Sequence, residues 1–518
     1  MAERSRKENP APLFREVPFH NPAELLASLQ GQDYLALLDS AARSPRLGRY
    51  SYLAFAPFAV FRSSGGIAYW NDTRLDDPPF VALNRKLGEY RRATAIATSK
   101  ENQFPPFQGG ALGYLSYEAG RLLEKLPQTT RDGEMGEDIL LPFYDLVLAV
   151  DHFANSGNAP ADTRANDTGS PRAFVFSSGW PHEGKDRALH AEKRLDWFCD
   201  KLAEASENIS PHHSTPSPIS GWQSDKTRAA FEQSIEKTRD HIRQGDIFQA
   251  NITQRFSAHI PDAPNASPLD YYHALRTHNA APFAAYLAFA DHVIASSSPE
   301  RFITLDAAGH VETRPIKGTA PRDLADPQKD KMLAQQLMQS EKDRAENTMI
   351  TDLMRNDLSR VCEPGSIRVP QLCGLESYAR VHHLVSVITG HLKTPHGAVA
   401  LLAASFPGGS ITGAPKIRAM EIISALEDLP RGVYCGSIGY LGFDGAMDTN
   451  IAIRTVTFKA GMAHFNVGGG ITILSDPAAE YEECLHKASA LFKAFGTSLE
   501  AERAMLEQRP MRQDRGPS

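Results

Sequence analysis

The sequence contains no uninterrupted apolar run of about 18 residues, the length that a membrane-spanning helix needs. No spanning helix is therefore predicted. Residues 1–10 are charged and lack an apolar centre, so we do not expect a secretory signal there. Cysteine is scarce and forms no Cys-x-x-Cys pair, which argues against a disulfide framework or a zinc site and favours reduced thiols in a cytoplasm. The five cysteines are Cys199, Cys362, Cys373, Cys435 and Cys484.

An excess of positive charge is also missing. The 518 residues include 55 Lys and Arg against 62 Asp and Glu, for a net charge of −7, whereas nucleic-acid-binding domains usually carry a basic face. The glycine-rich stretch 107–117 lacks the GxGxxG and GxxxxGK spacings of nucleotide-binding loops, so we interpret it as a structural strand. The remaining composition, 42% hydrophobic and 23% charged, is that of a globular protein.

A stretch that contains Pro211, Pro216 and Pro218 is predicted to be a linker and divides the chain. The predicted divisions are a disordered tail, 1–10; an N-terminal region, 11–203; the linker, 204–224; a motif-rich region, 225–495; and a C-terminal tail, 496–518. Strands occur in runs with helices between them, without strict alternation. This order favours an α+β fold with large antiparallel sheets over a doubly wound fold.

Lys317 is the central residue of a proline-rich stretch, 312–322. The pattern predicts that Lys317 lies in a loop at a strand end, stiffened by Pro315 and Pro321, with a long helix from Pro327 to about 358 that breaks near 342–344. A lysine held in this way is a candidate nucleophile or anion partner. A solvated loop lysine would account for the same pattern.

The last long helix, expected from Asp476 to about Phe495, carries a polar stripe. Glu480, Glu483 and Lys487 recur at helical spacing, beside a glycine-rich strand end at 467–471. Two carboxylates on one stripe suit a hard cation such as Mg²⁺, which prefers oxygen ligands. The alternative is a solvated face stabilised by a Glu483–Lys487 pair.

Other candidates are single polar residues in apolar surroundings. Arg454, on a predicted strand, needs an anionic partner, either a substrate carboxylate or an internal salt bridge. His383 is either a satisfied core histidine or a catalyst. Thr412 lies in a loop, 408–416, whose free backbone N–H groups suit a carboxylate unless the loop is a plain junction. Glu300 lies in a predicted tight turn.

Six motifs occur in one order along the chain and resemble those of the chorismate-utilising enzymes. They read Ser-Pro-Glu-Arg-Phe (298–302), Arg-Pro-Ile-Lys-Gly-Thr (314–319), Asp-Arg-Ala-Glu-Asn-Thr-Met-Ile-Thr-Asp-Leu-Met-Arg-Asn-Asp (343–357), Val-His-His-Leu-Val-Ser (381–386), Pro-Gly-Gly-Ser-Ile-Thr-Gly-Ala-Pro-Lys (407–416) and Glu-Tyr-Glu-Glu-Cys-Leu-His-Lys (480–487). The resemblance is dense over 225–495 and looser in the N-terminal region. It implies an α+β fold in which two large antiparallel sheets pack together, with helices outside and both regions in one body.

Lys317 distinguishes branches within this family. Anthranilate synthases usually have alanine at this position, whereas lysine resembles the branch that forms 4-amino-4-deoxychorismate for folate synthesis. Ala281-Pro282-Phe283 also resembles that branch. Anthranilate synthase component I remains the alternative. A non-catalytic regulator that binds chorismate or tryptophan would be expected to lack some of Glu300, Glu346, Glu480 and Glu483, and all four are present.

The resemblance implies roles for named residues. Mg²⁺, held by Glu346, Glu480 and Glu483, would grip the ring carboxylate of chorismate. Lys317 would attack C2, and Glu300 would act as general acid and base. The positions that match residues lining the chorismate site are Thr412, His383, Arg454, Gly469, Gly470 and Lys487.

Two partners are also implied. No glutaminase-like nucleophile motif surrounds any of the five cysteines, so the resemblance implies a separate glutamine amidotransferase subunit that supplies ammonia. The family's tryptophan pocket matches Ser40, Arg49, Tyr50, Pro282 and Phe283. The loop 41–48 is longer here than in some relatives, so whether this chain binds tryptophan stays open.

Overall fold

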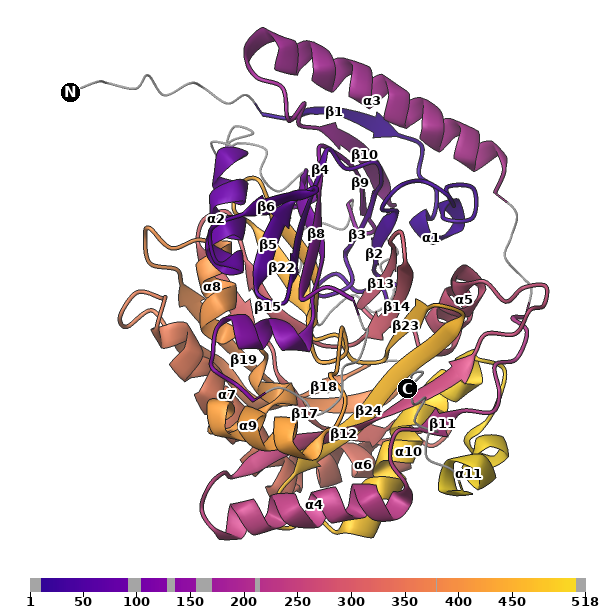
Figure 1. Ribbon diagram of the computed structural model, residues 1–518, viewed down its shortest axis with the longest axis vertical. Coiled ribbons are helices and arrows are strands. Elements are labelled where there is room, and N and C mark those ends of the chain that lie inside the picture. Colours follow the sequence, from indigo (N-terminus) through magenta and orange to yellow (C-terminus); the bar gives the residue numbers. More distant parts are fainter. Residues whose placement is uncertain are drawn as a thin grey trace, which may run out of the picture.

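The computed structural model describes residues 11–91, 104–127, 136–154, 170–209, 215–378 and 380–508. The predicted disordered tail, 1–10, lies outside these residues. Within them the chain forms two large sheets of twelve strands each, and every strand pairing is antiparallel (Figure 1). No helix of the described part combines the length and apolar character needed to cross a membrane.

The first sheet joins strands from both regions of the chain. Its N-terminal and C-terminal blocks meet at one seam, where Asp39 pairs with Ala284. The strand order is β1 (Leu13–Val17), β10 (Arg172–Ser177), β9 (Leu146–Asp151), β3 (Tyr50–Ala54), β2 (Ala36–Asp39), β13 (Phe283–Ala288), β14 (His292–Ser298), β23 (Thr455–Lys459), β24 (Met462–Ile471), β12 (Gln249–His259) and β11 (Gln223–Ser224), with β20 (Gly413–Ala414) also paired to β12.

The second sheet is divided in the same way. Its seam is the pairing of β7 with β21, in which Leu115 lies opposite Ser437. The strand order is β17 (Ile316–Pro321), β19 (Val381–His391), β16 (His310–Thr313), β15 (Arg301–Leu305), β22 (Met447–Asn450), β21 (Ser437–Gly442), β7 (Gly110–Leu115), β8 (Ile139–Tyr144), β4 (Ala59–Ser64), β5 (Ile67–Trp70) and β6 (Thr73–Leu75), with β18 (Arg368–Ser377) paired to β19.

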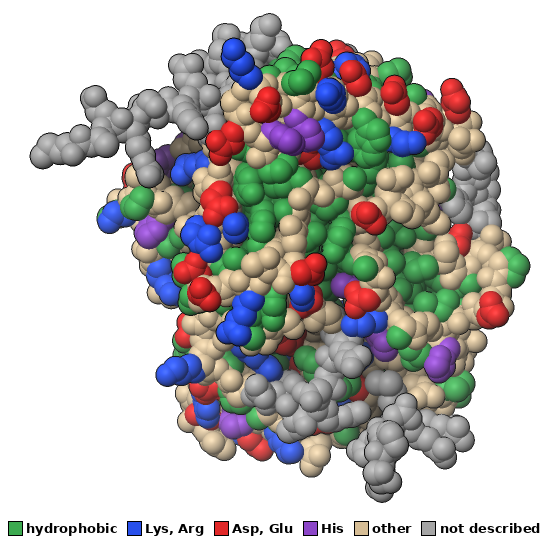
Figure 2. Space-filling view, turned by 45° about the horizontal axis from the view of Figure 1, so that its top comes forward, with side chains coloured by type: hydrophobic (Ala, Val, Ile, Leu, Met, Phe, Trp, Pro, Cys, Tyr) green, Lys and Arg blue, Asp and Glu red, His purple; other side chains and the backbone are tan. Residues whose placement is uncertain are grey.

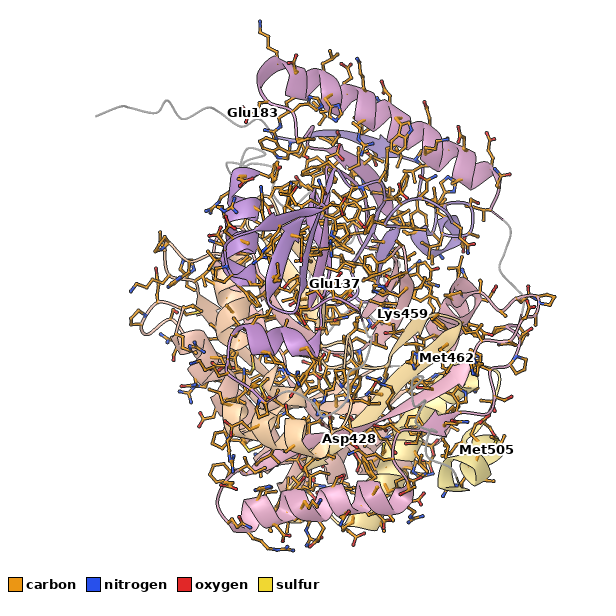
Figure 3. The ribbon with its side chains drawn as sticks, in the orientation of Figure 1. Glu137, Glu183, Asp428, Lys459, Met462 and Met505 are labelled. Carbon is orange, nitrogen blue, oxygen red and sulfur yellow. The ribbon has the colours of Figure 1, made fainter. Side chains whose placement is uncertain are left out.

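A hydrophobic core lies between the two sheets. Tyr52 and Ile294 from the first sheet belong to the same buried cluster as Leu112 and Tyr440 from the second. The rings of Phe107 and Tyr440 stack with their centroids 4.4 Å apart. Full burial of one such side chain contributes about 1.5–3 kcal/mol, and Figure 3 shows side chains throughout the space between the sheets. The predicted α+β fold, with two antiparallel sheets packed together and helices outside, is confirmed.

Helices cover the outer faces. On the first sheet, α3 (Gly184–Glu207) lies along β1 and β10 at the top of Figure 1, and α4 (Arg228–Arg243) runs along the bottom. On the second sheet, α7 (Glu341–Ser359) contacts β17 and β19. The other elements are α1 (Pro22–Leu25), α2 (Pro79–Glu89), the 3₁₀ turn η2 (Tyr117–Leu122), α5 (Pro268–His278), α6 (Pro327–Gln339), α8 (Ala398–Ser405), the 3₁₀ turn η4 (Gly409–Ile411), α9 (Lys416–Leu426) and α10 (Pro477–Ala494).

The predicted break in the long helix after Pro327 occurs at Ser340, slightly before 342–344. Ser340 leaves the helical conformation, with ψ at 108°, and its hydroxyl accepts a hydrogen bond of 3.3 Å from the backbone N–H of Asp343. This bond satisfies a donor that the first turn of α7 would otherwise leave free. The sequence therefore contains two helices where one with a break was expected.

Two predicted irregular segments contain regular structure. Residues 204–207 form the last turn of α3, and Gln223–Ser224 forms β11, so the helix and the sheet extend into both ends of the predicted linker. The predicted tail 496–518 includes α11 (Leu499–Gln508). This helix packs because Leu499 and Leu506 are buried, and Glu502 accepts hydrogen bonds from the backbone N–H groups of Gly221 and Trp222. Residues 509–518 lie outside the described part.

Surface charge is mixed. On the face in Figure 2, blue Lys and Arg side chains are interspersed with red Asp and Glu side chains around a hydrophobic area, and no extended area has one sign. On this face, the distribution agrees with the small net charge.

Candidate active site

Lys317 lies in the edge strand β17 and not in the loop that its proline-rich surroundings predicted. The strand pairs with β19, but its register shifts between Ile316 and Thr319. Gly318, in this interval, has φ at +88°, a conformation that glycine adopts without strain. The prolines flank the irregularity and do not prevent pairing. The amine of Lys317 lies 3.2 Å from the point that a Cβ on Gly470 would occupy.

Charged groups surround the Lys317 amine. Burial lowers its pKa from the ordinary lysine value; Glu346 opposes this shift, Lys487 adds to it, and Glu300 and Glu483 oppose it more weakly. The net pKa is lowered. A lower pKa increases the fraction of neutral amine, which is the form that can attack carbon.

Glu300 is held at the junction of β14 and β15. Its carboxylate accepts a hydrogen bond of 3.4 Å from the backbone N–H of Ile316. Burial raises its pKa to about 7, while the Ser410 hydroxyl, the Lys317 amine and that N–H partly offset the rise. A carboxyl group with this pKa can donate and accept protons near neutral pH. Ser410 was not singled out from the sequence, although it lies in the predicted loop 408–416.

The three predicted metal-ligating glutamates come from two helices. Glu346 lies on α7, while Glu480 and Glu483 lie on α10. Burial raises the pKa of Glu346. Burial would also raise the pKa of Glu483, but Lys487, Lys342 and Lys317 outweigh it, and the pKa is lowered. The amine of Lys487 is 2.9 Å from Glu483.

These carboxylates fit a hard cation in chemistry but are paired with lysines. Oxygen donors of this kind are the ligands that Mg²⁺ prefers. Lys342 approaches Glu480 to 3.6 Å. In the described ranges, no three His, Cys, Asp or Glu side chains converge closely enough to enclose an ion. The three carboxylates are therefore of the kind that binds Mg²⁺, while Glu480 and Glu483 form ion pairs with Lys342 and Lys487.

Arg454 is a half-buried cation with a neutral partner. Its guanidinium donates to the side-chain oxygen of Asn279 at 3.1 Å, and burial lowers its pKa. No carboxylate pairs with it in the part of the chain that the structure describes. The internal salt bridge that the sequence left open is absent there. A half-buried arginine of this kind is suited to bind an anionic ligand.

His383 lies close to Arg454 and is held by β17. Its Nδ1 is 2.9 Å from the hydroxyl of Thr319. Burial, reinforced by the positive charge of Arg454, lowers the pKa of His383 to about 4. The imidazole is therefore neutral at physiological pH and can act as a hydrogen-bonding group.

Two glycines of β24, Gly469 and Gly470, lie next to side chains of the site and form its floor. Gly470 pairs with Asn251 of β12, whose N–H donates to the carbonyl of Thr412 at 2.8 Å. A Cβ on Gly469 would lie 3.3 Å from Glu480 and 3.4 Å from the amine of Lys487. The Thr412 hydroxyl donates to the carbonyl of Gly408 at 3.0 Å, so it is bonded within its own loop.

Contacts, strand pairing and electrostatic interactions thus connect all the residues predicted for the catalytic, metal and substrate roles, directly or through a neighbouring residue. These residues are Lys317, Glu300, Glu346, Glu480, Glu483, Thr412, His383, Arg454, Gly469, Gly470 and Lys487.

Gln249 is a site residue that sequence reasoning missed. It is buried at the start of β12, with its amide nitrogen against Gly470 and beside Lys317. Among the described residues, its side-chain oxygen accepts no hydrogen bond. Buried polar atoms are nearly always paired, so this oxygen is an acceptor open to a further partner. The signal in the sequence was a glutamine between apolar residues at the start of a strand.

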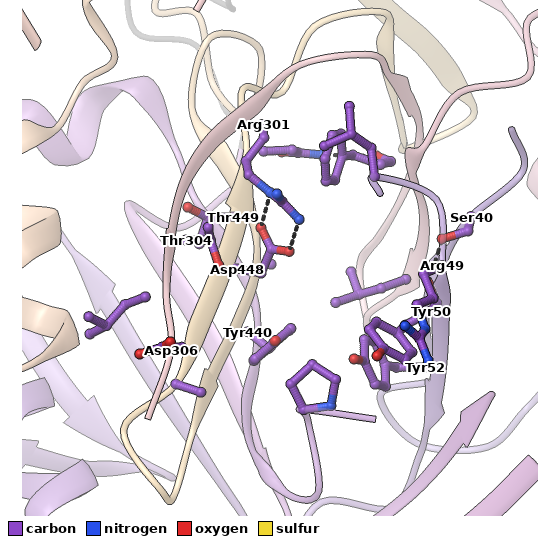
Figure 4. A pocket seen from close by; sticks show the side chains of 18 of the residues that line it. Ser40, Arg49, Tyr50, Tyr52, Arg301, Thr304, Asp306, Tyr440, Asp448 and Thr449 are labelled. Carbon is purple, nitrogen blue, oxygen red and sulfur yellow. Dashed lines mark hydrogen bonds and ion pairs between the residues drawn. The ribbon is translucent and has the colours of Figure 1, made fainter. Parts of the chain in front are cut away.

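A separate cavity of about 850 Å³ lies between the sheets. The five predicted tryptophan-binding residues, Ser40, Arg49, Tyr50, Pro282 and Phe283, all line it. Arg49 forms a bidentate pair with Asp151, at 2.9 and 2.8 Å. In Figure 4, Arg49 and Tyr50 face the Arg301–Asp448 ion pair across the cavity. Arg301, which lines the cavity, directly follows Glu300 in the sequence.

Comparisons with known proteins agree with this arrangement. The family described as chorismate binding enzyme matches residues 39–493. Aminodeoxychorismate synthase component 1 of Salmonella typhimurium is 43% identical over 386 residues, which are 74% of this chain and 76% of the relative. Anthranilate synthase component 1 of Thermus thermophilus is 36% identical over 463 residues, 88% of this chain and 91% of the relative. The solved structure of anthranilate synthase component I from Streptococcus pneumoniae has a TM-score of 0.72 at 30% identity, covering 86% of this chain and 92% of that one.

Proposed function

The chain belongs to the chorismate binding enzymes, and we propose that within this family it converts chorismate and ammonia into 4-amino-4-deoxychorismate, a precursor of p-aminobenzoate and folate. The observation that carries the proposal is Lys317, whose amine is buried among Glu346, Lys487 and Glu300 and has a lowered pKa. The name of the Salmonella relative, at 43% identity, supports the same reaction.

Substrate binding is assigned to the cationic and small residues of the site. Arg454, whose side-chain partner among the described residues is the neutral Asn279, would receive a carboxylate of chorismate. Neutral His383, Thr412 and the floor of Gly469 and Gly470 would position the ring, with Lys487 nearby. Glu346, Glu480 and Glu483 would hold Mg²⁺, which when bound supplies positive charge for the ring carboxylate.

The covalent step is assigned to Lys317 and Glu300. The neutral amine of Lys317 forms a bond to C2 of chorismate, both ring double bonds shift by one position toward C4, and the C4–O bond breaks. Glu300 donates its proton, so the hydroxyl leaves as water, and the carboxylate then takes the proton that the new secondary amine loses. Ammonia adds at C4, both double bonds return, and the C2–N bond breaks. Glu300 gives its proton to the departing amine of Lys317 and takes one from the new ammonium group at C4.

Ammonia requires a source. We assign it to a separate glutamine amidotransferase subunit, because no glutaminase-like motif surrounds the five cysteines. The relatives' names contain the words component 1, which implies a second component.

Product identity tests this function. The pure chain is incubated with chorismate, Mg²⁺ and ammonium at alkaline pH, with and without an aminodeoxychorismate lyase. We expect p-aminobenzoate only with the lyase. A Lys317→Ala variant should lose this product while its circular dichroism spectrum is unchanged. Unchanged turnover in the variant would rule out the covalent mechanism.

Anthranilate synthesis is the second candidate. The Thermus relative, at 36% identity, and the cavity lined by the predicted tryptophan-binding residues favour it. This reading predicts fluorescent anthranilate without the lyase. Tryptophan binding to the cavity, which we propose for either function, is measured separately by calorimetry.

A further inference from the structure

Lys342 is a charged residue near the site to which the proposed chemistry gives no role. It lies in the first turn of α7, one helical turn before Glu346. Its amine is 3.6 Å from Glu480, whose side chain is 7% exposed. Lys342 also interacts electrostatically with Glu346 and Glu483. It therefore contacts, or lies close to, all three glutamates that the proposed function assigns to Mg²⁺.

The surroundings of Lys342 keep it charged. Its side chain is 41% exposed, and its ammonium group lies 3.6 Å from the carboxylate of Glu480. Lys487 differs because it is held by Glu483 and by the carbonyl of Gly468, at 3.1 Å. A monovalent cation thus stands among the carboxylates and offsets their mutual repulsion in the free protein.

We propose that Lys342 is a resident counter-ion, which a divalent cation must displace from Glu480 and Glu346 in order to bind. The inference rests on the metal site of the proposed function. Displacement is feasible because the Lys342 side chain is 41% exposed and ends in a flexible stem that can carry its ammonium group into solvent. No other carboxylate holds it among the described residues.

This arrangement makes metal binding depend on the substrate. With the charged Lys342 and Lys487 beside the glutamates, the free site has little net negative charge left to attract a divalent cation. A dianionic substrate such as chorismate restores negative charge at the same place. The metal therefore binds the free protein weakly and the substrate complex more tightly, and by thermodynamic linkage each ligand increases the affinity for the other.

Direct cation binding to the full chain, without substrate, tests the proposal. Isothermal titration with Mg²⁺ and electron paramagnetic resonance with Mn²⁺ are measured for the natural chain, for Lys342→Met and for Lys329→Met. Lys329 is the matched control, because it forms an exposed 2.9 Å pair with Asp323 in another part of the protein. Lys342→Met should bind the cation about tenfold more tightly, since a like charge is removed from the site, and Lys329→Met should bind as the natural chain does.

Stability gives a second measurement. Without metal, Lys342→Met should melt at a lower temperature than the natural chain, because the glutamates lose their counter-ion, and Mg²⁺ should raise its melting temperature more than that of the natural chain. Equal or weaker cation binding in Lys342→Met overturns the proposal. So does the absence of cation binding in both proteins.

The product assay separates the two hypotheses. If Lys342→Met binds the cation more tightly but the natural chain makes no aminodeoxychorismate, the proposed function fails and the role of Lys342 stands. If the natural chain makes the product and Lys342→Met binds the cation no more tightly, only the role of Lys342 fails.

Discussion

Lys416 donates a hydrogen bond of 2.6 Å to the buried carboxylate of Asp357 and a second, of 2.7 Å, to the carbonyl of Ser405. Lys416 begins α9, directly after the loop that contains Ser410 and Thr412. Asp357 lies near the end of α7, the helix that carries Glu346. The ion pair therefore joins two parts of the candidate active site that are distant in the sequence.

Removing this pair should destabilise the protein strongly. Lys416→Met leaves the Asp357 carboxylate buried without a partner, so we expect a loss of about 3–5 kcal/mol in the free energy of unfolding. Urea denaturation measures it. Arg355→Met is the control, because Arg355 forms an exposed pair with Asp352, and its loss should cost less than about 1 kcal/mol. Similar losses in both variants would contradict the structural role of the Lys416–Asp357 pair.

Glu300 should make stability depend on pH. Its pKa is about 7 in the folded protein, against 4.5 as its ordinary value. The folded state therefore holds a proton that the unfolded state has released between these two pH values, so stability falls as pH rises from 4.5 to 7. Glu300→Gln removes this loss of stability. The free energy of unfolding of the variant, relative to that of the natural chain, should increase by about 3 kcal/mol from pH 4.5 to pH 7. Above pH 7 this difference should stay constant. Urea denaturation across this range checks it; a pH-independent difference would show that Glu300 ionises normally.

Arg454 should oppose stability and support activity. Arg454→Met removes a half-buried charge that lacks a carboxylate partner in the described residues, so we expect the melting temperature to rise. The same change removes a charged hydrogen-bond donor to substrate and should lower kcat/KM for chorismate by about 100-fold. Arg454→Lys, which keeps the charge, should show no gain in melting temperature. If Arg454→Met lowered the melting temperature, Arg454 would have a structural role.

Gly470 should tolerate no side chain. A Cβ there would collide with the amide nitrogen of Gln249 and lie 3.2 Å from the amine of Lys317. Gly470→Ala should therefore displace Gln249 and reduce turnover by at least about tenfold, through misplacement of reacting groups. Gly88→Ala is the control, because nothing lies within 4 Å of the added methyl group in α2 and alanine favours helix. Steady-state kinetics of both variants measure the difference.

The residue types of the candidate site could be listed from the sequence because each motif carries its own residue types, while their catalytic and metal-binding roles stay predictions. Glu480, Glu483 and Lys487 share a helical stripe through spacing alone, and the order of the motifs identified the family. The two-sheet fold was predictable for the same reason. Helix α7 was predicted apart from its start, which depends on the Ser340 cap.

Pairing between distant segments was not predictable. Lys317 belongs to a strand because β17 pairs with β19, which lies more than sixty residues later in the sequence. The local proline content cannot indicate that partner. Asn279 satisfies Arg454 from the end of α5. The unpaired oxygen of Gln249 and the hydrogen bond of Ser410 to Glu300 are likewise tertiary features. Helix α11 was missed because its stability comes from contacts such as Glu502 with Trp222 and not from its polar sequence.

The two seams between N-terminal and C-terminal strands have a consequence for biosynthesis. On the ribosome, β2 and β7 emerge long before β13 and β21, their partners across the seams. Until then the nascent N-terminal half carries two unpaired strand edges, which are templates for wrong pairing with other chains. Truncation before residue 283 would leave both edges unpaired permanently, so a shortened chain should aggregate rather than fold as an independent half.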